Sequence, residues 1–163
     1  METAYFAGGC FWCITPGFRE MAGVANVISG YSGGREENPA YEDVKHQRTG
    51  HRETIRIDFD PAIVSFDELL TQFLNSVDPF DDGGQFIDRG HSYTLAVYYT
   101  NEAQRLSAYR QITALEIMAG MKTAVSLEKF TKFWRAEEYH QDYYRKHPEE
   151  FRKELIDSGR MKG

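Results

Sequence analysis

Apolar and polar residues alternate most regularly in the segment HRETIRIDFD, residues 51–60. Ile55, Ile57 and Phe59 occupy odd-numbered positions, whereas arginine, threonine and aspartate occupy the even-numbered ones. A repeat of two places the odd positions on one face, so the segment is predicted to be a half-buried β-strand. Other apolar runs predict strands at residues 3–8, 23–34, 92–100 and 123–128.

Helical spacing of apolar residues follows directly after Ser65. Ser65 and Glu68 have the pattern of a capping box, which predicts a helix that begins there. Further helices are predicted over residues 101–120, and over residues 137–157 with a break near Pro148.

The predicted elements follow in the order strand, helix, strand, strand, helix, strand, with further elements after them. This order fits the α+β class, as a two-layer sandwich with a ferredoxin-like βαββαβ core, an extra C-terminal helix and long loops. The longest loop, residues 76–91, contains one proline, three glycines and four aspartates, and is predicted to lie on the surface and to be functional. Because the sequence shows neither a repeat nor a linker, residues 1–163 are expected to form a single domain.

The composition restricts the classes of function. A chain of 163 residues can bury a sizeable core without disulfides or metals. Its 25 acidic and 19 basic side chains show no basic stripe, so no nucleic-acid partner is expected. There is neither a signal segment nor a run of about 20 apolar residues, so no membrane association is expected and the protein is predicted to be cytoplasmic.

The only two cysteines, Cys10 and Cys13, lie three positions apart in the segment GGCFWC. Cys10 is predicted to start a helix, and the helix N-terminus is expected to lower its pKa by stabilising a thiolate. Cys13 would lie on the same side of the first helical turn, within reach of a disulfide. The residues leave four interpretations open: a metal half-site completed by histidine, a thioredoxin-like couple, two inert buried thiols, or a nucleophile with a resolving thiol.

Glu53 is a polar residue on the apolar face of the alternating strand. One interpretation places it at the outer end of the strand, where it reaches water beside His51. The other is that burial raises its pKa, so that it remains protonated near neutral pH and acts as a general acid. Tyr41 precedes this strand, and Tyr93 heads the apolar face of its own predicted strand. Both are candidates to bind a polarised oxygen, although most buried tyrosines only pack.

Six segments, in order and spacing, resemble the motifs of class A peptide methionine sulfoxide reductases. They extend from about residue 4 to residue 148 and read GGCFWC, SGYSGG, NPAYEDV, TGHRETIRIDFDP, GGQFIDRGHSY and AEEYHQDYY. The resemblance implies an oxidoreductase that reduces methionine (S)-sulfoxide, free or in proteins, to methionine, without a cofactor or a metal. The alternative function is a metal-binding or redox-sensing module that uses the two cysteines and a histidine.

The resemblance also implies roles for individual residues. Cys10 is expected to attack the sulfoxide sulfur and to become a sulfenic acid. Glu53 is expected to protonate the sulfoxide oxygen, and Tyr41 and Tyr93 to donate hydrogen bonds to it.

Four more roles follow from the same resemblance. Phe11 and Trp12 are expected to form the walls of a pocket for the methyl group, and Asp88 to lie at the backbone side of the substrate. Cys13 is expected to attack the sulfenic acid and form a disulfide with Cys10, which thioredoxin or a similar dithiol reopens. Many members of the family have glycine at the position of Cys13 and carry resolving cysteines in a C-terminal tail, which is free of cysteine in this chain.

Overall fold

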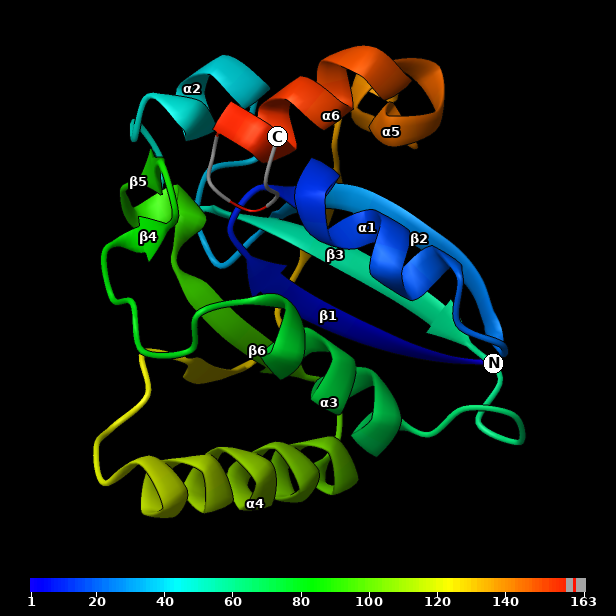
Figure 1. Cartoon of the computed structure of the whole chain (residues 1–163), viewed down its shortest axis with the longest axis vertical. Coiled ribbons are helices and arrows are strands. Elements are labelled where there is room, and N and C mark those ends of the chain that lie inside the picture. Colours follow the sequence, from blue (N-terminus) through cyan, green and yellow to red (C-terminus); the bar gives the residue numbers. More distant parts are fainter. Residues whose placement is uncertain (158–159, 161–163) are drawn as a thin grey trace.

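The computed structural model describes residues 1–157 and 160, and this part of the chain has an α+β fold (Figure 1). Six of its strands form one sheet in the order β7-β6-β1-β3-β2-β8. All neighbouring strands are antiparallel except β6 and β7, which are parallel. The strands are β1 (Glu2–Gly8), β2 (Val24–Ser32), β3 (Arg52–Phe59), β6 (Leu95–Tyr99), β7 (Ser126–Lys129) and β8 (Phe133–Arg135).

Helices cover one face of the sheet and extend beyond its edges. In Figure 1, α1 and α3 lie next to each other across the sheet, α4 lies beyond α3, and α2, α5 and α6 gather at the upper end of the view. The α-helices are α1 (Phe11–Arg19), α2 (Tyr41–Lys45), α3 (Phe66–Ser76), α4 (Glu102–Ala119), α5 (Tyr143–Lys146) and α6 (Pro148–Asp157). The short elements are the hairpin β4 (Gly84–Gln85) and β5 (Asp88–Arg89), and the 3₁₀ turns η1 (His91–Tyr93) and η2 (Glu138–His140). None of the described helices is long and apolar enough to cross a membrane.

The centre of the sheet is buried on both faces, which explains why β1 is a continuous apolar run. Ala4 and Phe6 belong to the main core between sheet and helices, where the Phe6 ring stacks on Phe73 of α3. The alternate residue Tyr5 faces the other way and stacks on Phe130, in the segment that joins β7 to β8. A strand covered on both faces loses the apolar–polar alternation of a half-buried strand.

Two glycines allow β1 to pass directly into α1. A Cβ atom at Gly8 would lie 2.9 Å from Cε1 of Phe73 and 3.0 Å from Cδ1 of Ile14, so a larger residue has no room there. Gly9 adopts φ +82°, in the left-handed region that glycine populates without strain. The turn brings Cys10 to the N-cap position of α1 immediately after a central strand.

The predicted alternation of residues 51–60 and two helix starts are confirmed. In β3 the odd-numbered residues, Glu53 included, are buried, and Thr54 is buried as well. Ser65 and Glu68 form the full capping box of α3. The side chain of Asn101 caps α4, which ends before Gly120 in the left-handed conformation.

The predicted strand at residues 92–100 begins too early. Gly90 has φ +118°, and the amides of Tyr93 and Thr94 bond to the carbonyls of Gly90 and His91 at 3.0 and 3.1 Å. Tyr93 therefore lies in η1 and not on the strand, because this turn closes before β6 starts at Leu95.

The predicted helix over residues 137–157 is wrong in its first half, which consists of η2 and α5. Asp142, in the left-handed region at φ +51°, separates them, and α6 starts at Pro148. The reason lies in the side chain of Gln141, which bonds to the carbonyls of Ser29 and Ala136 at 2.9 and 3.0 Å and accepts the Ser29 amide at 2.9 Å. These bonds hold the chain beside β2 and prevent a continuous helix.

The loop at residues 76–91 is only partly at the surface. Gln85, in the β4–β5 hairpin, is fully buried, and its side chain accepts the amide of Asp78 at 2.8 Å and donates to the carbonyl of Asp78 at 2.9 Å. These bonds fold the loop inward and position Asp88 three residues later.

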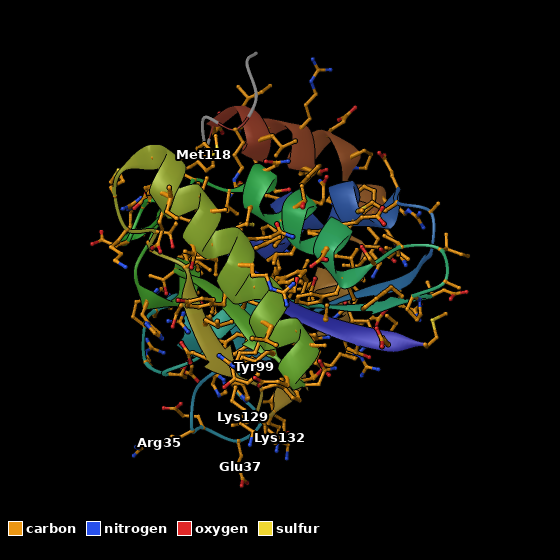
Figure 2. All side chains as sticks on the ribbon, turned by 90° about the horizontal axis from the view of Figure 1, so that it is seen from below. Arg35, Glu37, Tyr99, Met118, Lys129 and Lys132 are labelled. Atoms are coloured by element: carbon orange, nitrogen blue, oxygen red, sulfur yellow. The ribbon has the colours of Figure 1, made fainter. Side chains whose placement is uncertain are left out.

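The outward side of α4 has apolar as well as charged side chains. Ala108 and Ile112 face the core, whereas Ile117 and Met118 are 77 % and 87 % exposed. Figure 2 shows Met118 at the far end of this helix. The helix α4 is therefore a peripheral element, and it contributes nothing to the cavity described next.

Candidate active site

Six of the eight predicted site residues line one cavity of about 160 Å³ at the N-terminal end of α1. Segments far apart in the sequence meet there: the start of α1, both ends of α2, the start of β3, the β4–β5 hairpin, η1 and α6. The lining residues are Cys10, Trp12, Tyr41, Lys45, Glu53, Asp88, Tyr93 and Glu154. The other two predicted residues, Phe11 and Cys13, lie beside this cavity without lining it.

Glu53 has no access to bulk water, with 2 % of its surface exposed, so the interpretation that it reaches solvent is wrong. Its Oε1 accepts the backbone amide of Phe11, the first residue of α1, at 3.2 Å. Burial raises the pKa of Glu53 well above its usual value, the Phe11 amide lowers it, and the carboxylate of Asp88 raises it further. Burial is the largest of these effects, and it favours the neutral acid form of Glu53.

The register of the sheet explains why Glu53 meets Cys10. Phe6 of β1 pairs with Ile55 of β3, and the same antiparallel register continued by two residues places Gly8 beside Glu53. Two residues after Gly8 the chain reaches Cys10. The acid and the thiol are thus brought together by the pairing of two central strands and a glycine turn.

The Cys10 thiol is 6 % exposed, and the expectation that its pKa is lowered is wrong for this structure. The hydrogen bond between the two thiols, followed by burial, raises the pKa of Cys10 well above its usual value. The first amide of α1, on Phe11, donates to Glu53 and therefore is not available to the thiol. Both raised pKa values favour the neutral forms of Cys10 and Glu53.

Cys13 lies one helical turn after Cys10, as predicted, and its amide bonds to the Cys10 carbonyl at 3.1 Å. It is partly exposed and lines a second cavity, of about 420 Å³, together with Val77, Phe86 and Arg160. Both cysteines are free thiols. The two cysteines thus line different cavities while their thiols share a hydrogen bond.

Tyr41 and Tyr93 add two phenols to the cavity of Cys10. Burial raises the pKa of both hydroxyls, and the nearby carboxyl of Glu53 raises it further, so both remain protonated donors. The start of α2 is held in place by Glu137, whose carboxylate accepts the Tyr41 amide at 3.0 Å and the Tyr31 hydroxyl at 2.9 Å. Glu137 thereby positions Tyr41.

Aromatic rings form one side of the cavity around Trp12. The indole stacks on Tyr143 with 4.1 Å between ring centroids, and its Nε1 donates to Nδ1 of His140 at 3.0 Å. Burial lowers the pKa of His140 to about 4, so this ring is neutral and accepts the bond. Phe11 lies behind, 1 % exposed, with its ring centroid 6.5 Å from that of Tyr41.

Lys45 and Glu154 also line the cavity, and neither was predicted as a site residue from the sequence. Lys45 ends a short helix, and Glu154 lies on α6, which has no buried residue. Glu154 could be predicted as a site residue only if it were known that α6 packs against α1. The third charged residue is Asp88, and its pKa is raised by burial first and by Glu154 second.

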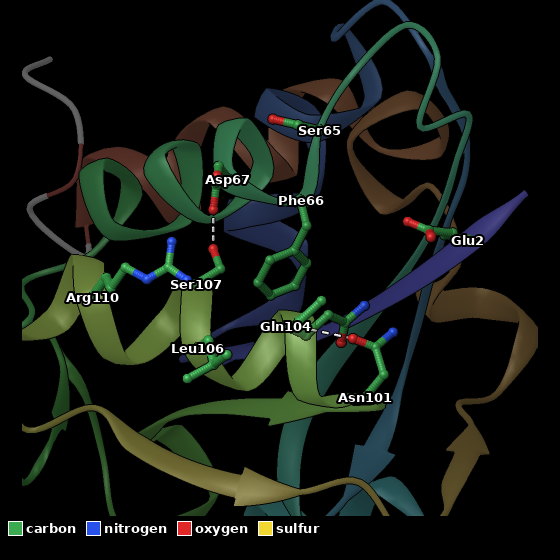
Figure 3. Close-up of a pocket in the computed structure, with 10 residues that line it drawn as sticks. Glu2, Ser65, Phe66, Asp67, Asn101, Gln104, Leu106, Ser107 and Arg110 are labelled. Atoms are coloured by element: carbon green, nitrogen blue, oxygen red, sulfur yellow. Dashed lines mark hydrogen bonds between the residues drawn. The ribbon is translucent and has the colours of Figure 1, made fainter.

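Another hollow, of about 390 Å³, lies between α3, α4 and the start of β1 (Figure 3). Its polar groups bond to one another: the Gln104 amide donates to Asn101, and the Ser107 hydroxyl donates to Asp67. The residues that line it include no cysteine, histidine or tyrosine. This groove between packed helices has none of the groups that the cavity around Cys10 brings together.

The metal half-site lacks further ligands. Over residues 1–157 and 160, no group of three or more histidine, cysteine, aspartate or glutamate side chains is arranged to hold a metal ion. His51, the histidine nearest to Glu53 in sequence, bonds through Nε2 to the carbonyl of Glu36 at 2.7 Å and accepts the Gly34 amide at 3.2 Å. It holds the loop after β2 in place.

Two adjacent thiols, a neutral acid and two phenols around one small cavity are the groups of an oxidoreductase that works through thiols. Residues 2–162 match the family model of peptide methionine sulfoxide reductase, and the chain belongs to this family. It reduces methionine sulfoxide by thiol chemistry. The resemblance seen in the six segments is confirmed.

Individual relatives agree. The chain is 45 % identical to the peptide methionine sulfoxide reductase MsrA of Bacillus licheniformis over 161 residues, which are 98 % of this chain and 89 % of the relative. Among solved structures it is similar to reduced Mxr1 of Saccharomyces cerevisiae, with a TM-score of 0.85, 25 % identity and coverage of 91 % of this chain and 86 % of that one. Mxr1 in complex with Trx2 has the same fold at a TM-score of 0.57 and 19 % identity, over 87 % of this chain and 84 % of that one.

Proposed function

We propose that Cys10 is the nucleophile and Glu53 the acid in the reduction of methionine (S)-sulfoxide, free or in proteins. The observation that supports this most strongly is the position of Glu53. It is 2 % exposed, it lines the cavity of Cys10, and burial raises its pKa. A sulfoxide oxygen becomes a leaving group only when it is protonated, and a neutral buried acid can supply that proton at neutral pH.

The first step transfers one oxygen atom. As Sγ of Cys10 bonds to the sulfoxide sulfur, Glu53 gives its proton to the oxygen and recovers a proton from the Cys10 thiol. The oxygen then bonds to Sγ of Cys10, while the substrate's sulfur–oxygen bond and the transient bond between the two sulfur atoms both break. Cys10 is thereby oxidised to the sulfenic acid and the substrate leaves, reduced to methionine. The neutral resting state of both groups provides the two protons that this exchange needs.

The other cavity residues bind the substrate. The hydroxyls of Tyr41 and Tyr93 donate hydrogen bonds to the sulfoxide oxygen as negative charge develops on it. Trp12, backed by Phe11, provides an apolar wall for the S-methyl group. Asp88 accepts from the nitrogen of the substrate backbone.

Cys13 resolves the intermediate. Its thiol attacks the sulfenic sulfur of Cys10, water leaves, and a Cys10–Cys13 disulfide remains. A dithiol protein of the thioredoxin type then reduces this disulfide. Two observations support this partner: Cys13 is partly exposed, and yeast Mxr1, which has this fold, was solved with Trx2.

A single-turnover assay without reductant tests these roles. Wild-type protein should release about one equivalent of methionine and lose both free thiols. Cys13→Ser should also release one equivalent but stop as a sulfenic acid that a sulfenic-acid probe labels. Cys10→Ser should release none. Methionine release by Cys10→Ser would overturn the nucleophile, and two surviving thiols after wild-type turnover would overturn the role of Cys13.

The finer description of the fold belongs to the same proposal. The strand order β6-β1-β3-β2, antiparallel throughout, supports a ferredoxin-like βαββαβ core in which α1 and α3 are the two helices, within a single domain. We place the protein in the cytoplasm, because a dithiol that cycles through a disulfide works only where a reductant restores it.

A further inference from the structure

Three charged side chains line the active-site cavity without a part in the transfer of oxygen. Lys45 comes from the end of α2, Asp88 from the β4–β5 hairpin and Glu154 from α6. Their charges act on one another and on the acid: Glu154 raises the pKa of Asp88 and Tyr93, and Lys45 lowers the pKa of Asp88 and of Glu53. Arg160, which lines the neighbouring cavity of Cys13, also lowers the pKa of Asp88, by more than Lys45 does. The three side chains form one electrostatic group at the mouth of the cavity.

The carboxylates of this group have oxygen atoms that accept no hydrogen bond from the described residues. Oδ2 of Asp88 is buried and has no hydrogen-bond partner within the described residues. In the same part of the chain neither Glu154 nor Lys45 makes a side-chain hydrogen bond or an ion pair, and the ammonium group of Lys45 lies 5.6 Å from the ring centroid of Tyr41. Charged groups in a small, partly closed cavity are costly unless a ligand pairs with them.

The size and charge of the cavity favour one kind of substrate. Its volume of about 160 Å³ is well below the ~300–1,000 Å³ of pockets for larger ligands, so the ligand is small. Two carboxylates and one ammonium are complementary to the ammonium and carboxylate of a free amino acid. A residue within a protein chain offers neutral amides in their place, which pair less well with Glu154 and Lys45 than the two charged groups of a free amino acid do.

We propose that Asp88 and Glu154 bind the α-ammonium group of free methionine sulfoxide and that Lys45 binds its α-carboxylate, so that the enzyme prefers the free amino acid to the residue in a protein chain. The proposal rests on the proposed function, since it names the substrate class of that site. It assigns a role to α6, which supplies Glu154 and lies across the same end of the molecule as α2 (Figure 1). The subsite is complete only when α6 is in place.

Four substrates separate the two charge contacts: methionine (S)-sulfoxide, its amide, its N-acetyl derivative and its N-acetyl amide. The amide keeps the α-ammonium group that the N-acetyl amide lacks, so the ratio of kcat/KM for these two substrates reports the ammonium contact. Glu154→Gln should lower this ratio by about tenfold or more, since a hydrogen bond to a charged group contributes on that scale. The N-acetyl derivative keeps the α-carboxylate that the N-acetyl amide lacks, so the ratio of kcat/KM for these two substrates reports the carboxylate contact. Lys45→Met should lower this second ratio. Glu154→Gln should leave the ratio for the carboxylate contact within about twofold of wild type, and Lys45→Met should do the same for the ratio of the ammonium contact.

The matched control is Glu150→Gln, one helical turn earlier on α6, where the side chain is exposed and outside the cavity. It should leave every ratio at the wild-type value, and circular dichroism should show all variants folded. Ratios that do not change in Glu154→Gln and Lys45→Met would overturn the subsite. If wild-type protein reduces none of the four substrates, the proposed function itself fails, and the two failures are thereby distinguished.

Discussion

Replacement of Glu53 with glutamine (Glu53→Gln) keeps the length of the side chain and an oxygen that accepts the Phe11 amide, but it removes the acidic proton. A positioned general acid contributes about 10² to 10⁴ in rate, so the single-turnover rate of methionine release should fall by that factor. The thiols of Cys10 and Cys13 should remain free and titratable in the variant.

The same substitution should change stability in a pH-dependent way. Burial raises the pKa of Glu53 in the folded state above its value of about 4.3 in an unfolded chain. The folded protein therefore binds more protons in this interval, and the contribution of Glu53 to the free energy of unfolding falls by about 1.4 kcal/mol for each pH unit above ~4.3. The loss ends when pH exceeds the folded pKa.

Urea unfolding of both proteins at pH 5, 6, 7 and 8 measures this difference. Glutamine does not titrate, so the free energy of unfolding of wild type minus that of Glu53→Gln should become more negative as pH rises, by at most about 1.4 kcal/mol per pH unit, and should level off once pH exceeds the folded pKa of Glu53. Groups common to both proteins cancel in the difference. A difference that is independent of pH would show that Glu53 has the same pKa folded and unfolded. A release rate within about tenfold of wild type would show that it is not the acid.

Three further substitutions test the site and the core. Tyr93→Phe should lower the single-turnover rate by about 10²-fold, as loss of one oxyanion donor does, and a change below threefold would contradict its role as a donor. Phe6→Ala should lower the free energy of unfolding by about 3–5 kcal/mol in urea, because Phe6 is fully buried and stacks on Phe73 at 4.8 Å, and a cost below ~1 kcal/mol would contradict this packing. Ser65→Ala should lower it by about 1 kcal/mol through loss of the bond to the Glu68 amide, whereas Ser65→Gly should cost only a few tenths.

Short sequence patterns predicted the structure correctly wherever a segment's structure depends on that segment alone. The alternation in β3 predicted that Glu53 faces inward, and the capping box at Ser65 predicted the start of α3. The spacing of Cys10 and Cys13 predicted two thiols on one helical turn. Each of these predictions depends on the period of one element or on a hydrogen bond between close neighbours in sequence.

Contacts between distant segments determined the rest, and a single sequence contains no period that reports them. The strand β8 is three residues long and forms by pairing with the edge of β2. Gln141 interrupts a predicted helix because its amide bonds to Ser29, 112 residues away. The lowered pKa expected for Cys10 did not allow for burial, or for the Phe11 amide turning to Glu53.

The two cysteines face different cavities, and this separates the places where oxidation and reduction occur. In the proposed mechanism the sulfoxide reacts at Cys10, which is 6 % exposed, whereas Cys13 lines a second and larger cavity. A thiolate from a protein reductant therefore meets Cys13 first, and Cys10 departs as the leaving thiol. On this proposal a Cys10–Cys13 disulfide links the cavity where the substrate is reduced to the cavity where the reductant attacks, so substrate and reductant use different openings.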